Sequence, residues 1–386
     1  MLKRAVTTFA PLRLPLVDAM RAAAATLIAW HHFVVYAPLA CWEVPALEPV
    51  LDVVSSCQWA AQVFFVLGGF VMAHSMSRLT WDVRQVGVFV VRRYCRLGLP
   101  YLAAIALALW AYSIGQGSLS EDVLGPPPTV AQVLAHVVFL QDILGYESLS
   151  AGFWFVCIDF QLCLIYVAML FLGDAPSRLF GHWEAERSKV APIALGWALA
   201  VPSLFSFNLH DDFDMWAIYF FGQFFLGVMV YHGLKNPRLK ALLGLYFLMT
   251  AAALAYDWRW RLAASLLTGL ALFCGGKFGL LERWPMSRTI AYLGRTSYSL
   301  FLVHFPVFII VSTLWVQFDW TSPWPTAAEL IVAYIASLIA ADVFYRAIEA
   351  PTARLARKLF ASDNDPQRQD PAPLEAVGEL VLGRSN

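Results

Sequence analysis

Charged residues are scarce in this sequence. Asp, Glu, Lys and Arg make up 14% of the 386 residues, and hydrophobic residues make up 60%. A typical soluble domain is about 25% charged and about 45–50% apolar, so the composition excludes an ordinary soluble domain and indicates an integral membrane protein. The 27 basic and 27 acidic residues cancel. The net charge therefore indicates no class of partner, and we predict no binding of nucleic acid.

Cysteine is also sparse. The six cysteines show none of the paired spacings typical of a zinc site, so we predict no metal. Cys41 and Cys57 both lie near the predicted outer face and are candidates for a disulfide, although spacing alone does not fix the geometry. The sequence also lacks a repeat of fixed period and a cleavable signal peptide, so we expect the first apolar run to stay in the membrane.

Long hydrophobic runs, in contrast, are abundant. A helix needs about 20 mainly apolar residues to cross a bilayer, and about ten such runs follow one another. Because they lack the alternation of outer-membrane strands, we predict an all-α polytopic membrane helix bundle. The predicted spans are 18–40, 56–77, 97–115, 150–172, 190–207, 214–233, 241–256, 262–280, 292–317 and 326–348. Residues 129–143 are apolar but short, which predicts an interfacial or re-entrant helix.

The basic residues predict the orientation. With the N-terminus in the cytoplasm, every Lys and Arg except Arg259 and Arg261 falls on the cytoplasmic side, as the positive-inside rule requires. We therefore predict a multi-pass protein of a bacterial-type inner (plasma) membrane, with both termini cytoplasmic. Residues 1–16 form a cytoplasmic segment and 17–358 the transmembrane domain, while the polar, proline-containing residues 359–386 predict a disordered cytoplasmic tail.

The first span carries ionisable residues at a regular spacing. Arg21 and His32 are eleven positions apart, which places them on one helix face and about 16 Å apart along the axis. Arg21 then lies at the cytoplasmic mouth and His32 near the midplane, while His31 points about 100° away and is interpreted as a packing residue. Ionisable residues inside a membrane span are candidates for function.

Two further spans place ionisable residues at the same depth. Asp159 in the fourth span and His304 in the ninth both fall near the midplane. A buried carboxylate beside an imidazole orients the ring and raises its basicity. His32, Asp159 and His304 therefore form a candidate constellation for deprotonating a hydroxyl group. The fourth span also carries Trp154 and Gln161.

The cytoplasmic end offers a second constellation. Arg93 and Arg96 lie one helical turn apart, just before the third span. Guanidinium groups suit phosphates, so these two residues, with Arg21 at the same mouth, predict a polyphosphate ligand. The alternative is an ordinary positive-inside cluster.

Taken together, these segments resemble the membrane acyltransferase-3 family, which includes O-antigen, exopolysaccharide and nodulation-factor O-acetyltransferases. The resemblance covers roughly residues 12–358. Two positions depart from the family phrases, with Gly68 where Ser is usual and Asp159 where Glu is usual. The residues that carry it are the Arg21-x10-His32 spacing, "QVFFVLGGFVMAHS", "RRYCRLGLPY", "FWFVCIDFQL", "LGRTSYSLFLVHFPV" and "FYRAIEAP".

The resemblance implies transfer of an acyl group, most often acetyl, from cytoplasmic acyl-CoA to a hydroxyl of an extracytoplasmic glycan or lipid-linked saccharide, with no metal. Arg21, Arg93 and Arg96 would bind the nucleotide phosphates. His32 would act as general base, Asp159 would orient His32 or the acceptor, and His304 would polarise the thioester carbonyl or hold the acceptor. The substrate-side candidates are Trp154, Gln161 and Trp320.

Several alternatives stay open at this point. Transfer can be direct or pass through an acyl-histidine, and the donor can carry acetyl, succinyl or a longer chain. Trp42, Trp320 and Trp324 suit either sugar stacking or an aromatic interface belt. A proton-coupled transporter also uses midplane His and Asp residues, but the inverted repeats of such transporters are not recognisable. The oligomeric state is not indicated.

Overall fold

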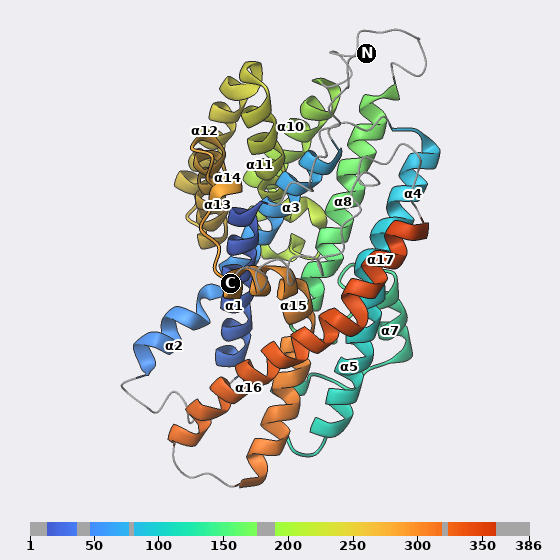
Figure 1. Cartoon of the computed structure of the whole chain (residues 1–386), viewed down its shortest axis with the longest axis vertical. Coiled ribbons are helices and arrows are strands. Elements are labelled where there is room, and N and C mark those ends of the chain that lie inside the picture. The colour runs from blue at the N-terminus through green and yellow to red at the C-terminus, as the bar shows by residue number, and fades with distance from the viewer. Residues whose placement is uncertain (1–13, 37–46, 77–80, 176–189, 319–322, 360–386) are drawn as a thin grey trace, which may run out of the picture.

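The computed structural model describes residues 14–36, 47–76, 81–175, 190–318 and 323–359. Every regular element in these ranges is helical (Figure 1). The first half contains α1 (Pro15–Val35), α2 (Glu48–Ser55), η2 (Cys57–Ala60), α3 (Ala61–Met76), α4 (Val83–Arg93), η3 (Tyr94–Gly98), α5 (Leu99–Gly115), α6 (Glu121–Leu124), α7 (Val130–Val137) and α8 (Phe153–Gly173). The second half contains α10 (Val190–Phe205), η4 (Phe207–Leu209), η5 (Asp211–Phe213), α11 (Ala217–Lys235), η6 (Pro237–Leu239), α12 (Lys240–Tyr256), α13 (Trp260–Lys277), α14 (Leu280–Arg283), α15 (Arg288–Trp315), η7 (Val316–Phe318), α16 (Pro323–Phe344), η8 (Tyr345–Glu349) and α17 (Ala350–Leu359).

The predicted all-α membrane bundle is confirmed. Each predicted span corresponds to a helix, and 8 helical segments of the described chain are long and apolar enough to cross a membrane. The other two, α1 and α13, carry charged or histidine residues along their length, which lowers their hydropathy. The polar content of α1 includes Asp18, Arg21 and the two histidines, so the same residues that mark it as functional weaken its hydrophobic signal.

Helices α3 and α11 approach each other closely along the bundle. Helix α11 is buried along most of its length. A Cβ at Gly69 would collide with the carbonyl oxygen of Phe224, and a Cβ at Gly227 with that of Val66. The two backbones therefore touch at a glycine of each helix, as in other tightly packed membrane helices.

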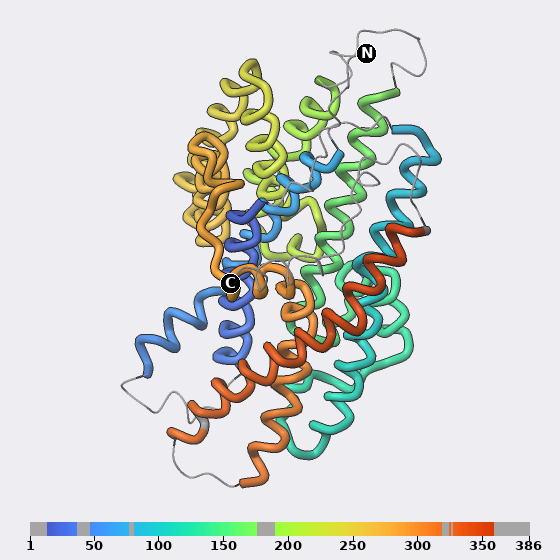
Figure 2. The backbone as a smooth tube through the Cα atoms, viewed as in Figure 1, coloured from blue at the N-terminus to red at the C-terminus, as the bar shows by residue number. Residues whose placement is uncertain are grey.

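Helix α15 is the second organising element, because it packs against α1, α5 and α16. Helix α16 continues through η8 into α17 and crosses over α15 and α5 in one long run (Figure 2). This packing sets α1, which carries His32, beside α15, which carries His304.

The short segment predicted at 129–143 contains helix α7. Thr129 and Gln132 form a capping box at its start. His136 fixes the loop that follows, because its Nε2 accepts a hydrogen bond from the Leu149 amide (3.0 Å) and its Nδ1 donates to the Gln132 carbonyl (2.8 Å). The loop that carries Asp142 is thereby held in place. Cys41, Trp42, Trp320, residues 1–13 of the predicted N-terminal segment and residues 360–386 of the predicted tail lie outside the described residues.

Candidate active site

The structure brings His32 and His304 into direct contact. His32 Nδ1 lies 2.7 Å from His304 Nε2, and the two rings are stacked with centroids 5.1 Å apart and planes 10° from parallel. Both residues are buried, with exposed fractions of 9% and 1%. The two histidines, which the sequence placed at one depth, therefore also face each other.

The neighbours of His304 fix where the protons lie. His304 Nδ1 is 3.0 Å from the carbonyl oxygen of Leu300, which can only accept, so Nδ1 carries a proton. In neutral His304, Nε2 then accepts a hydrogen bond from the Nδ1–H of His32. His32 is left with its lone pair on Nε2, which makes no hydrogen bond in the described part of the chain. This is the protonation state that a general base requires.

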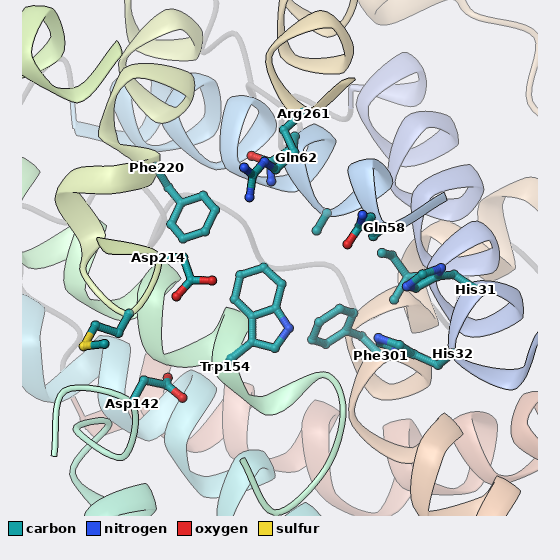
Figure 3. Close-up of a pocket in the computed structure, with 13 residues that line it drawn as sticks. His31, His32, Gln58, Gln62, Asp142, Trp154, Asp214, Phe220, Arg261 and Phe301 are labelled. Atoms are coloured by element: carbon teal, nitrogen blue, oxygen red, sulfur yellow. The ribbon is translucent and has the colours of Figure 1, made fainter. Parts of the chain in front are cut away.

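His32 lines a cavity of about 380 Å³ (Figure 3). Trp154 lies across this cavity, between Phe220 and Phe301, and the histidines lie at one side. The lining residues come from α1, η2, α3, α8, α11, α13, α15 and two loops: Ile28, His31, His32, Gln58, Ala61, Gln62, Asp142, Trp154, Asp214, Met215, Phe220, Arg261 and Phe301. Volumes of about 300–1,000 Å³ are usual for sites that bind small molecules.

His304, expected to polarise the thioester or hold the acceptor, lies behind His32 and does not line this cavity. It is absent from the cavity wall, and both of its ring nitrogens are engaged, one by His32 and one by the Leu300 carbonyl. This geometry suits a residue that positions His32.

Asp159, expected to orient His32 or the acceptor, pairs with Arg93 and not with His32 in the described residues. Its Oδ2 lies 2.6 Å from Arg93 Nη2, because α4, which ends at Arg93, packs against α8. The described residues give Asp159 no hydrogen bond to His32. On the α3 side, Asp159 lies next to Gly68, where a Cβ would lie 3.5 Å from Asp159 Oδ1. The two departures from the family phrases are therefore neighbours.

The three arginines predicted to bind phosphate gather at one place. Arg21, Arg93 and Arg96 interact electrostatically with one another and with Glu349 or Asp159. Arg93 Nε is buried without a hydrogen-bond partner, and neither Arg21 nor the exposed Arg96 makes a hydrogen bond in the described part of the chain. Guanidinium donors therefore remain available at this cluster.

Glu349 accepts a hydrogen bond from Ser299 Oγ (2.5 Å). Arg96 and Arg21 lie within electrostatic range of the same carboxylate. The hydroxyl contact, from α15, fixes the carboxylate while the arginines stay free of direct ion pairs with it in the described residues.

Two π-helices carry this cluster, and the sequence explains both. The π-helix η3 holds Arg96, and the π-helix η8 holds Glu349. Each ends two residues before a proline, Pro100 or Pro351, which lacks the N–H that would bond to the carbonyl four residues earlier and whose ring crowds that carbonyl. A widened turn relieves both problems, and such turns are frequent at functional sites. The prolines were a signal that span counting overlooked.

The three residues predicted on the substrate side differ in their relation to the cavity. Trp154 lines the cavity, whereas Gln161 does not, because its Nε2 donates to the Phe139 carbonyl (3.2 Å) and contacts Cys157 Sγ (3.0 Å). Trp320 lies outside the described residues. The sequence reasoning missed the lining residues Gln58, Gln62, Asp142, Asp214 and Arg261, although Arg261 stood out as one of two basic residues on the outer side.

The charged groups at the cavity lie in loops, as Asp142 and Asp214 do, or at the end of a span, as Arg261 does at the start of α13. Arg261 pairs with Asp211 (2.8 Å) and stacks over the Tyr219 ring. Burial raises the pKa of Asp142 to about 6 and also raises the pKa of Asp214. Among the described residues, no group of three or more His, Cys, Asp or Glu side chains gathers as a metal site.

Comparison with known families agrees with this geometry. A family model described as an acyltransferase domain matches residues 15–346, which is most of the chain. Neither the curated proteins nor the solved structures yield a match. An enzyme family leaves the proton-coupled transporter alternative without support. The chain belongs to the acyltransferase-3 family and is a membrane-embedded O-acyltransferase.

Proposed function

We propose that this enzyme transfers an acyl group, most often acetyl, from cytoplasmic acyl-CoA to a hydroxyl of an extracytoplasmic glycan or lipid-linked saccharide. It would lie in an inner membrane with both termini on the cytoplasmic side. The observation that carries the proposal is the free Nε2 of His32, at the cavity wall, on a ring whose Nδ1 is held by His304.

The chemistry follows from that arrangement. His32 Nε2 takes the proton of the acceptor hydroxyl as its oxygen attacks the thioester carbonyl carbon. The tetrahedral intermediate collapses, the C–S bond breaks, and the imidazolium returns the proton to the departing sulfur. The products are an ester and the free CoA thiol. While His32 is charged, its Nδ1–H bond to His304 strengthens, because charge-assisted hydrogen bonds are stronger than neutral ones.

The arginine cluster suits the donor. Arg21 lies on α1 about 16 Å from His32 along the helix axis, and Arg93 and Arg96 lie beside it. A nucleotide whose phosphates bind these guanidinium groups sends its extended pantetheine arm toward His32. The acceptor enters from the side where Asp142, Asp214 and Arg261 line the cavity.

Covalent catalysis is the competing mechanism, and it uses the same nitrogen of His32. In an acyl-enzyme route, His32 Nε2 attacks the thioester itself and the acceptor then attacks the acyl-imidazole. Acid quenching during turnover, followed by peptide mass spectrometry, separates the routes. An acyl adduct on His32 supports the covalent route, and its absence during rapid turnover supports direct transfer.

The test of the function is release of CoA thiol by protein in nanodiscs, with acetyl-CoA and succinyl-CoA compared. We expect slow transfer to water without an acceptor, and its loss in His32→Ala. His210→Ala, an exposed loop histidine, is the matched control and should behave as wild type. No thiol release and no CoA binding that depends on Arg93 and Arg96 would overturn the proposal.

A further inference from the structure

Gln62 is buried beside the cavity with an unsatisfied acceptor. Its exposed fraction is 2%, it lines the cavity, and its Oε1 has no hydrogen-bond partner in the described part of the chain. Burying a polar atom without a partner destabilises the fold. Because Gln62 itself lines the cavity, a ligand that donates a hydrogen bond to this oxygen would satisfy it.

The surroundings of Gln62 suit a ring with hydroxyl groups. Gln58, one helical turn earlier, lines the same cavity, so two amides face the ligand from adjacent turns. Trp154 presents its ring to the cavity between two phenylalanines (Figure 3). Aromatic faces pack against the apolar faces of saccharide rings, while amides bond to their hydroxyls.

The charges around the cavity discriminate against an anion. Asp142 and Asp214 lie together on one side of Trp154 (Figure 3). The cation at the wall, Arg261, already has Asp211 as its partner at 2.8 Å. Carboxylates that face a ligand repel a like charge, and this repulsion excludes unwanted partners.

We infer that the cavity selects an uncharged or cationic polyhydroxylated ring over an anionic one, with Gln62 as the residue that accepts a hydrogen bond from a ring hydroxyl. Identifying this ring as the acyl acceptor rests on the proposed function. The binding preference itself does not.

The test compares three glycosides that differ in charge. The probes are methyl glucoside, methyl glucosaminide and methyl glucuronide, and their binding to wild-type protein in nanodiscs is titrated by saturation-transfer NMR without acyl-CoA. We expect the glucuronide to bind at least tenfold more weakly than the other two, and this gap to narrow in Asp214→Asn. Equal or tighter glucuronide binding, or no binding of the glucoside, overturns the inference.

The role of Gln62 has its own matched pair of variants. Gln62→Met should weaken glucoside binding at least tenfold yet raise the melting temperature, because an unsatisfied buried amide is removed. Gln223 is as buried, has no hydrogen-bond partner for either amide atom within the described ranges and lies off the cavity wall. Gln223→Met should raise the melting temperature and leave binding unchanged.

A third variant tests the role of Gln62 even if Gln62→Met does not fold. Gln62→Glu retains an acceptor oxygen and should keep glucoside binding within a few-fold of wild type. Wild-type affinity in Gln62→Met, or tenfold weaker binding in Gln62→Glu, overturns the assignment of Gln62. Since binding is measured without the donor, the proposed function can fail on thiol release while this inference stands, and the reverse.

Discussion

His304 holds His32 by a 2.7 Å contact between Nε2 and Nδ1, and is itself held by the Leu300 carbonyl. A main-chain carbonyl thus fixes the tautomer of His304, which in turn fixes that of His32. The usual partner of a catalytic imidazole is a carboxylate. Here an uncharged relay does the same orienting without placing a second charge in the membrane interior, where charge is unfavourable.

The first prediction concerns this relay. Because His304 only positions His32, His304→Ala should lower kcat about 10–100-fold, the range seen for groups that orient a catalytic ligand, and leave the KM for acyl-CoA unchanged. His304→Gln retains an acceptor oxygen and should recover part of the rate. The measurement is thiol release across pH: losing the partner of His32 should move the acid limb of the profile in His304→Ala. An unmoved acid limb would reduce His304 to a packing residue.

The second prediction concerns the donor. Arg96 is exposed and makes no hydrogen bond in the described residues, so Arg96→Ala should raise the KM for acyl-CoA about tenfold, the loss of roughly one charge-assisted hydrogen bond, with little change in kcat. The difference from wild type should shrink at high salt, because ions screen the interaction. Arg288→Ala, at the exposed start of α15, is the control. A fall in kcat at constant KM would contradict phosphate binding.

The third prediction uses two adjacent glycines. A Cβ at Gly68 meets Asp159 Oδ1 at an ordinary 3.5 Å, whereas a Cβ at Gly69 collides with the Phe224 carbonyl. Gly68→Ser should therefore fold normally, and its hydroxyl can donate to Asp159. Gly69→Ser should separate α3 from α11 and cost about 1–3 kcal/mol, as overpacked cores do. Thermal unfolding in detergent measures both, and equal melting temperatures would contradict the close approach of these helices.

The fourth prediction is a pH dependence of stability. Burial raises the pKa of Asp142 to about 6, above its unfolded value of about 3.9, so the folded state binds the proton more tightly. This group therefore stabilises the fold most below about pH 4, and that contribution is lost as the pH rises from about 4 to 6.

Asp142→Asn removes that titration. The variant should match wild type at pH 4 and unfold at a higher temperature above pH 6, since it never carries the buried charge. Asp212→Asn, in η5, is the control carboxylate. Melting temperatures measured between pH 4 and 8 decide the point, and parallel curves for Asp142→Asn and wild type would contradict a raised pKa.

The sequence by itself determined the helical bundle and the spacing of polar residues along a single helix. Apolar runs of about 20 residues without strand alternation form helices in lipid, since every backbone hydrogen bond must then be made within the segment. The constant rise of the helix then fixes how far a residue lies below the membrane surface. That is why Arg21 and His32 could be assigned to one face, and why Arg93 and Arg96 could be expected beside Arg21.

Only the tertiary structure decided which of these residues meet. Depth says nothing about the direction in which each helix faces, and that rotation is set by packing such as the glycine contact between α3 and α11. Asp159, expected near the midplane beside His32, instead contacts Arg93 of the arginine cluster, whereas His304 contacts His32. The cavity residues Gln62 and Asp214 were equally beyond local reasoning, because a cavity belongs to the space between elements and has no period in the sequence.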